Sequence, residues 1–141
     1  MKKLNLTILT PERVIVENIP VESVTIPAWD GEMSVLYNHI PYIAQLREGV
    51  MKYRDGDREE YFGVFWGFFE VYKNNVIILA EEAKLSKEID EEKTRQEYQR
   101  IKDAMVSRDK KQNLEDLEIE LKKTIVNLKL YGKIKKHKKE F

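Results

Sequence analysis

The sequence predicts a β + α protein, in which an N-terminal antiparallel β-sandwich or barrel of about ten short strands precedes an antiparallel hairpin of two helices. Up to about residue 85, short apolar runs alternate with polar residues and are separated by turn signals. Beyond Ser86 the apolar period lengthens to about 3.5 residues, which is typical of helices that pack along one face. We therefore expect two domains, over residues 1–85 and 86–141.

Charge and composition change at the same boundary. The 141 residues carry a formal net charge of zero, but residues 1–85 hold 9 basic and 13 acidic side chains, whereas residues 86–141 hold 16 and 12. The second part has one glycine and no proline. Because the whole chain is neutral, its charge does not indicate a nucleic-acid-binding protein. The absence of cysteine excludes disulfides and thiolate metal sites.

No stretch of the sequence predicts insertion into a bilayer. No apolar run approaches the roughly 20 residues that a spanning helix needs. The apolar residues near the start are interrupted by polar ones, which does not match a secretory signal. We expect a cytoplasmic chain that reaches a membrane only through a partner.

The first predicted strands lie within residues 4–27. Leu4, Leu6 and Ile8 alternate with polar residues, and a turn at 10–12 leads to a second strand around Val14. A third strand is predicted to end at Pro27, since proline cannot donate to a ladder.

A turn at Asp30-Gly31 and a fourth strand around Met33 and Val35 follow, and then an irregular loop that reaches Pro41. The rest of this domain is rich in β-forming residues. Glycine, aspartate and asparagine separate the runs, most strongly in Asp55-Gly56-Asp57. The runs are Ile43–Leu46, Val50–Tyr53, Tyr61–Phe65, Phe68–Tyr72 and Val76–Ala80.

Two helices are predicted after residue 86. Asp90 and Asn113 are the expected N-caps, because acidic residues follow each and favour a helix N-terminus. An apolar seam at spacings of three and four follows the second cap, with Val126, Leu130 and Ile134 off it. The seam consists of Leu114, Leu117, Leu121, Ile125 or Thr124, and Leu128. Few large apolar residues lie in the first helix, which suggests a weakly held, mobile hairpin.

No catalytic motif is evident in the sequence. It has no glycine-rich phosphate loop, no nucleophile elbow and no histidine pair at metal spacing. Asp30, Glu32 and His39 could be imagined as a metal cluster, but turn chemistry explains them better. A small hydrolase would lack a base and nucleophile pair.

The stretch from Val24 to Pro41 carries the clearest pattern: a strand ending in proline, then Asp-Gly-Glu, then a histidine followed two residues later by proline. In this pattern the chain resembles the N-terminal domain of the ε subunit of bacterial F-type ATP synthases. The resemblance extends along nearly the whole chain.

Further motifs support this resemblance, with some departures. Thr10-Pro11-Glu12 resembles the family's first hairpin. The run Trp66–Val71 resembles Gly-Gly, two hydrophobic residues and Glu-Val, with Trp66 in place of the first glycine. Tyr37 and Ser34 stand where the family usually has proline and glycine.

The resemblance implies a non-catalytic subunit of the central stalk. Such a subunit couples the γ subunit to the membrane c-ring through its sandwich and inhibits ATP hydrolysis through a mobile helical hairpin. It implies partner contacts for Asp30, Glu32 and His39, with Glu32 toward the c-ring and His39 toward γ. The expected location is peripheral, on the cytoplasmic face of the bacterial cell membrane.

The resemblance also bears on nucleotide binding. Ile89-Asp90 resembles the start of the family's nucleotide-sensing motif, and Arg100 stands at a matching basic position. The motif's Arg and Ala are replaced here. On the second helix, Lys123 stands where ATP-binding members carry an arginine, and lysine lacks the bidentate fork that arginine offers a phosphate. We expect no cofactor, with weak ATP binding disfavoured.

The basic residues of the second helix allow three interpretations of their role. The resemblance implies that Lys122, Lys123, Lys129 and Lys133 contact an acidic segment of the β subunit in the α/β catalytic head. The tail from Lys133 to Lys139 also fits a solvated helix end. The alternative is a nucleic-acid-binding module that uses this tail, which would show salt-dependent binding.

Overall fold

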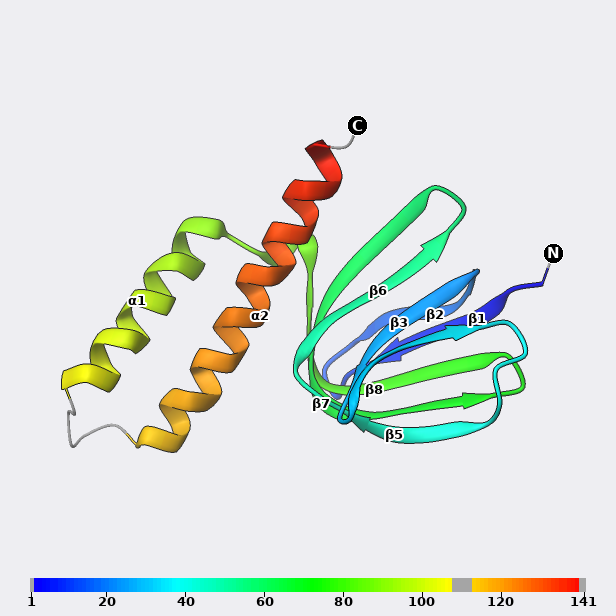
Figure 1. Ribbon diagram of the computed structural model, residues 1–141, viewed down its shortest axis with the longest axis horizontal. Coiled ribbons are helices and arrows are strands. Elements are labelled where there is room, and N and C mark those ends of the chain that lie inside the picture. The colour runs from blue at the N-terminus through cyan, green and yellow to red at the C-terminus, as the bar shows by residue number, and fades with distance from the viewer. Residues whose placement is uncertain (1, 108–112, 140–141) are drawn as a thin grey trace. The chain divides into compact units, whose positions relative to one another are not determined.

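The computed structural model describes residues 2–107 and 113–139, with side chains described through Lys133 (Figure 1). The chain divides into two compact units, Met1–Lys84 and Leu85–Phe141. The predicted break at residues 108–112 and the side chains of the predicted basic tail beyond Lys133 lie outside the described residues.

Eight strands form the described sandwich, fewer and longer than the ten short strands predicted. In chain order they are β1 (Leu4–Leu9), β2 (Val14–Val21), β3 (Ser23–Ala28), β4 (Gly31–Leu36), β5 (Tyr42–Leu46), β6 (Gly49–Asp55), β7 (Arg58–Tyr72) and β8 (Asn75–Leu85). The two runs predicted on either side of Gly67 are one strand, the 15-residue β7.

The strands form two layers that share β7. One layer has the order β2-β1-β8-β7-β5, and the other contains β4, β3, β6 and the first half of β7. β7 pairs with β6 through residues 58–64 and with β5 through residues 67–71. The prediction of an antiparallel fold holds with one exception, because β1 runs parallel to β8.

The core lies between these layers and consists of every second residue of most strands. This alternation follows from the period of two in a strand, which sends successive side chains to opposite faces. Fully buried members include Leu4, Leu6 and Ile8 of β1, Val24 and Ile26 of β3, Phe69 and Val71 of β7, and Val76 and Ile78 of β8.

Gly67 allows β7 to pass from one layer to the other. Its φ is +124°, and the preceding Trp66 also has a positive φ of 51°. A Cβ atom at Gly67 would lie 2.0 Å from the Leu79 carbonyl oxygen. A side chain is therefore excluded by the backbone conformation and by the close approach of β8. Such irregularities bend a strand and let it change sheets.

The tight turns agree closely with the sequence, with shifts of one residue. Gly56 and Asp57 connect Asp55 to Arg58, as predicted. The turn between β7 and β8 is Lys73-Asn74, one residue earlier than the Asn74-Asn75 turn that the asparagine pair predicts. β3 continues one residue past Pro27, and the Pro27 carbonyl accepts a hydrogen bond from the Arg47 N–H at 2.9 Å.

The second unit is a helical hairpin preceded by a short 3₁₀ turn, η1 (Ser86–Glu88). Its helices are α1 (Glu91–Ser107) and α2 (Leu114–Lys139), which lie side by side (Figure 1). Both predicted N-caps are confirmed. The Asp90 carboxylate accepts a bond from the Lys93 N–H at 3.1 Å, and the Asn113 side chain accepts one from the Glu115 N–H at 2.8 Å.

The predicted seam of α2 is partly wrong, because Leu121 and Leu128 are only half-buried, whereas Val126 and Leu130, which were predicted beside the seam, are buried. Leu117 and Thr124 are buried, as is Ile101 of α1. Thr124 takes the position for which Ile125 was the alternative, and its hydroxyl donates to the Glu120 carbonyl at 2.9 Å. Leu114 is 57% exposed, because it begins α2 at the end of the hairpin where α1 stops.

Replacing Gly67 with alanine tests the close approach of β7 and β8. We expect Gly67→Ala to lower the free energy of unfolding by about 3 kcal/mol or more, because strain and a steric clash add. Denaturant unfolding followed by tryptophan fluorescence measures this, since both tryptophans lie in the sandwich.

Gly31→Ala is the matched control. Gly31 has a similar φ of +133° but nothing within 4 Å of a Cβ atom. It should therefore show only the cost of the backbone strain, about 1–2 kcal/mol. Equal losses for the two variants would contradict the clash with Leu79.

Candidate functional site

The structure separates the predicted site residues Glu32 and His39 along β4. Glu32 is near the start of the strand, and His39 follows its end. The four residue-to-residue steps from Glu32 to Leu36 alone span about 13 Å of strand. Asp30, Glu32 and His39 therefore do not meet, and no group of possible metal ligands occurs among the described residues.

Asp30 and Glu32 lie at one end of the sandwich, in a cluster that we call the β3–β4 tip: Trp29, Asp30, Glu32 and Arg47. The turn is fixed by the Trp29 N–H, which donates to the Gln45 carbonyl at 3.0 Å. The Arg47 guanidinium carbon lies 5.9 Å from the centre of the Trp29 ring, whose residue is 55% exposed. Both acids are exposed, so the tip presents carboxylates and an aromatic ring to solvent.

His39 lies at the opposite end, in a segment that a side-chain bridge holds against the β7–β8 turn. The Asn38 N–H donates to the Asn74 side-chain oxygen at 2.7 Å, and the Asn74 amide donates back to Asn38 at 3.4 Å. The His39 Nδ1–H donates to the Ile40 carbonyl at 2.7 Å. Its ring meets Tyr42 edge-on, with centroids 6.4 Å apart.

Beside His39, the outer surface of β5, β7 and β8 carries exposed apolar side chains. Phe69 and Val71 point into the core, so Phe68, Glu70 and Tyr72 point outward. Ile43 lies directly across from Glu70 on β5. We call this surface the apolar face. Its exposed members are Ile43 at 69%, Phe68 at 52%, Leu79 at 50% and Tyr72 at 49%.

One edge of the apolar face is hollowed. An open depression of about 460 Å³ is lined by Pro41, Tyr42, Ile43, Glu70, Val71 and Tyr72. Contiguous exposed apolar surface on a soluble protein marks a site of interaction with a partner. The apolar face is therefore the best candidate for a docking surface among the described residues.

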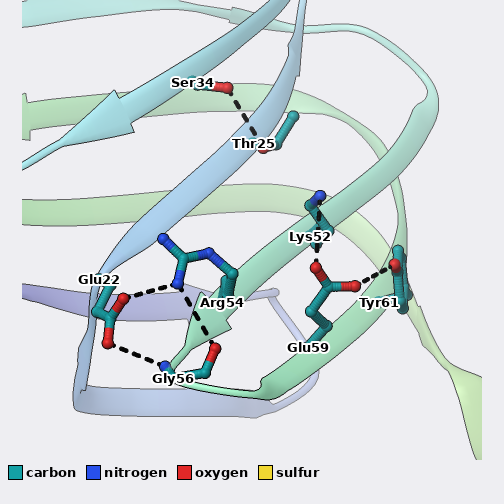
Figure 2. Close-up of polar contacts among 8 residues, drawn as sticks. All are labelled: Glu22, Thr25, Ser34, Lys52, Arg54, Gly56, Glu59 and Tyr61. Carbon is teal, nitrogen blue, oxygen red and sulfur yellow. Dashed lines mark hydrogen bonds and ion pairs between the residues drawn. The ribbon is translucent and has the colours of Figure 1, made fainter. Parts of the chain in front are cut away.

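The outer surface of the second layer has a different character, because its polar groups satisfy one another (Figure 2). Arg54 donates to Glu22 at 2.7 Å, and the Gly56 N–H donates to the same carboxylate at 3.0 Å. Next to this group the Tyr61 hydroxyl donates to Glu59 at 2.7 Å. These contacts organise the β6–β7 hairpin and leave few of its polar groups available to bind a partner.

The predicted nucleotide-binding residues have structural contacts in the hairpin. The Asp90 carboxylate caps α1, and its carbonyl accepts bonds from Thr94. Ile89 is half-buried at the end of η1. Arg100 donates to Glu97 on its own helix and to Glu120 of α2 at 2.9 Å. These two carboxylate contacts raise the pKa of Arg100 and hold its charge between the helices.

A second polar contact joins the helices at the other end of the hairpin. The Tyr131 hydroxyl donates to the Glu91 carboxylate, and this bond together with the carboxylate charge raises the pKa of Tyr131. The hairpin is thus joined by Arg100–Glu120 near one end and by Tyr131–Glu91 near the other. The Arg100–Glu120 pair is exposed to solvent, where such pairs contribute only about 0–1 kcal/mol, whereas Tyr131 and Glu91 are half-buried.

Three of the four predicted inhibitory lysines share one face of α2. Lys122, Lys129 and Lys133 are seven and four residues apart, so the helical period places them together. All three are exposed. Lys123 lies off this face and is half-buried, with an interaction of its own.

The apolar face was missed from the sequence. Phe68, Tyr72 and Leu79 were interpreted as ordinary strand residues, because a short apolar run does not reveal which side is covered. The continuous apolar run Val76–Ala80 predicts a strand that is covered on both faces, and this prediction is wrong for the free chain, in which Leu79 is half exposed. The structure leaves one of those faces uncovered.

Comparison with known proteins agrees with this architecture. The family model "ATP synthase, Delta/Epsilon chain, beta-sandwich domain" matches residues 3–86, more than half of the chain. The ATP synthase epsilon chain of Symbiobacterium thermophilum is 34% identical over 134 residues, which cover 94% of this chain and 95% of the relative. The chain belongs to the ATP synthase epsilon chain family.

Other epsilon chains and solved assemblies support the assignment. The epsilon chain of Moorella thermoacetica is 38% identical, with 95% of this chain and 100% of the relative covered. A chain in the Euglena gracilis mitochondrial ATP synthase structure, described as OSCP/F1/c-ring, matches with a TM-score of 0.77 and 27% identity. That match covers 86% of this chain and 77% of the other.

Family membership confirms the recognition made from the sequence motifs. As an epsilon chain the protein is a non-catalytic stalk subunit of a membrane-associated complex. A helix long and apolar enough to cross a membrane does not occur in the part of the chain that the structure describes.

The ion pairs of the hairpin predict a loss of helix in acid. The hydrogen bond from Arg100 lowers the pKa of Glu97. A group whose folded pKa is lowered stabilises the fold above its unfolded pKa of about 4.3, and this stabilisation is lost as the pH falls through the folded value. We expect the helical circular dichroism to weaken in that window before tryptophan fluorescence reports any change in the sandwich.

Glu97→Gln should reduce this acid transition of the helices. Glu118→Gln is the control, since Glu118 is an exposed glutamate of α2 that is not one of the two carboxylates bound by Arg100. If Glu97→Gln left the transition as steep as in the parent, the contact would not set the pH dependence.

Proposed function

We propose that this epsilon chain couples the γ subunit to the c-ring through its sandwich and restrains ATP hydrolysis through its helical hairpin. The observation that carries the proposal is the uncovered apolar face of β5, β7 and β8. A stalk subunit must transmit torque without slipping, and a contiguous apolar surface beside fixed polar groups suits a permanent interface.

The apolar face is the surface that we assign to γ. Its exposed members Ile43 and Phe68 supply area, and the depression beside Tyr42 can receive a partner side chain. His39 lies at the margin of this surface, on the segment fixed by Asn38 and Asn74. This placement supports the assignment of His39 to the γ contact.

The β3–β4 tip is the surface that we assign to the polar loops of the c-ring. Its carboxylates, Asp30 and Glu32, are exposed and lie away from the His39 end. Two contacts at opposite ends of β4 let one rigid sandwich connect two partners. The complex would hold the chain peripherally on the cytoplasmic face of a bacterial membrane.

Introducing a charge on the apolar face tests the γ assignment. We expect Ile43→Asp to weaken binding of the full-length chain to purified γ by about 30-fold or more, because a central interface residue contributes 2 kcal/mol or more. Titration calorimetry measures the affinity.

Ile119→Asp is the matched control, since Ile119 is a 44% exposed isoleucine of α2. It should bind γ as the parent does. If Ile43→Asp bound γ as tightly as Ile119→Asp, the apolar face would not be the γ interface.

Inhibition of ATP hydrolysis is assigned to the hairpin. The exposed row of Lys122, Lys129 and Lys133 suits an acidic segment of the catalytic head, with Lys123 beside it. The exposed Arg100–Glu120 pair between α1 and α2 contributes little stability, which supports a hairpin that opens. Arg100 and Asp90 are engaged within the hairpin, so this role is proposed without a bound nucleotide.

Removing the hairpin tests this role. Truncation after Leu85 should raise ATP hydrolysis severalfold by the assembled complex and leave assembly intact, because the sandwich is a compact unit by itself. A steady-state ATPase assay measures the change.

A full-length variant with Lys122, Lys129 and Lys133 changed to Glu should raise hydrolysis in the same direction. It separates loss of charge from loss of the helices. Unchanged hydrolysis in both proteins would show that the hairpin is not inhibitory.

A further inference from the structure

Glu70 is the single acidic side chain in the centre of the apolar face. It points outward from β7 between Phe68 and Tyr72, which are two residues away on either side. Ile43 of β5 lies directly across from it. Paired residues in neighbouring strands have Cβ atoms about 5 Å apart, so these side chains surround the carboxylate closely.

The other flank of Glu70 is apolar as well. β8 neighbours β7 in the sheet, and the two-residue turn Lys73-Asn74 connects them. This turn sets Tyr72 opposite Asn75, and therefore Glu70 opposite Ile77 and Phe68 opposite Leu79. Val76 and Ile78 are buried, so Ile77 and Leu79 share the outer surface with Glu70.

The carboxylate has no described partner within the chain. No hydrogen bond or ion pair of Glu70 occurs among the described residues, and the side chain is exposed. The nearest lysine in sequence, Lys73, instead places its ammonium group 5.3 Å from the centre of the Tyr72 ring. In the free chain, water therefore solvates Glu70.

When a partner covers this face, the Glu70 carboxylate loses its contact with water. A wholly apolar partner would bury an unpaired carboxylate, which is strongly unfavourable. A partner with an acidic group there would add repulsion. A partner that brings a cation to this point can bury the surrounding apolar side chains and compensate the charge directly.

We propose that Glu70 is the specificity-determining residue of the apolar face, and that the γ subunit seats an arginine or lysine side chain on it within a ring of apolar contacts. The ring consists of Ile43, Phe68, Tyr72, Ile77 and Leu79. This inference rests on the proposed docking of γ at the same face. The cation pairs with Glu70 as water leaves, and the ring excludes solvent from the pair.

The affinity of full-length Glu70 variants for purified γ tests the proposal. We expect Glu70→Gln to weaken binding about 30-fold or more, because removing one partner leaves the other charge buried and unpaired. Glu70→Lys should weaken it further. Both variants should melt as the parent does, since Glu70 is exposed in the free chain.

Glu17→Gln is the matched control. Glu17 is an exposed glutamate of β2, which lies three strands from β7, about 14 Å across the sheet. It should change the affinity by no more than about twofold. An effect of Glu70→Gln that is as small as this would overturn the proposal.

Charge reversal on the partner completes the test. Each arginine and lysine of γ is changed to glutamate in turn and paired with Glu70→Lys. We expect one such change to restore binding, and failure of every change would overturn the proposal. Ile43→Asp separates the docking of γ at the apolar face from the ion pair at Glu70. If Ile43→Asp lost binding while Glu70→Gln bound normally, the docking face would be supported and the ion pair would be rejected.

Discussion

The close contact between Gly67 of β7 and the Leu79 carbonyl of β8 is the constraint on which the rest of the sandwich depends. It allows one 15-residue strand to pair with β6 in one layer and with β5 in the other. Because β7 is continuous, the two layers cannot shift independently. The same bend turns Phe68, Glu70 and Tyr72 to the outside, so the element that closes the core also builds the apolar face.

The two units are held together by different kinds of interaction. The sandwich has a core of fully buried aliphatic and aromatic side chains, which is the dominant stabilising contribution in a fold of this size. In the hairpin, α1 buries one apolar residue, Ile101, and α2 buries Leu117, Val126 and Leu130, while the exposed Arg100–Glu120 pair joins the two helices.

The two outer surfaces of the sandwich differ in chemical character. On the outer surface of the second layer, the polar groups of Glu22, Arg54, Glu59 and Tyr61 satisfy one another (Figure 2). The apolar face leaves the Glu70 carboxylate without a described partner and most of its apolar side chains exposed. This contrast locates the docking surface at the side chains that the chain itself leaves exposed. A solvated charge at the centre of that surface can select a partner.

The sequence by itself determined the two-domain organisation, the helix caps at Asp90 and Asn113 and most of the turns, because each depends on residues close together in the chain. Its family motif also identified the chain correctly. Only the tertiary structure decided that β7 is one strand, that β1 lies parallel to β8, that Glu32 and His39 lie at opposite ends of β4, and that Leu114 is exposed. These features depend on contacts between distant segments, and an alternating pattern shows that a strand has two faces without showing what covers each one.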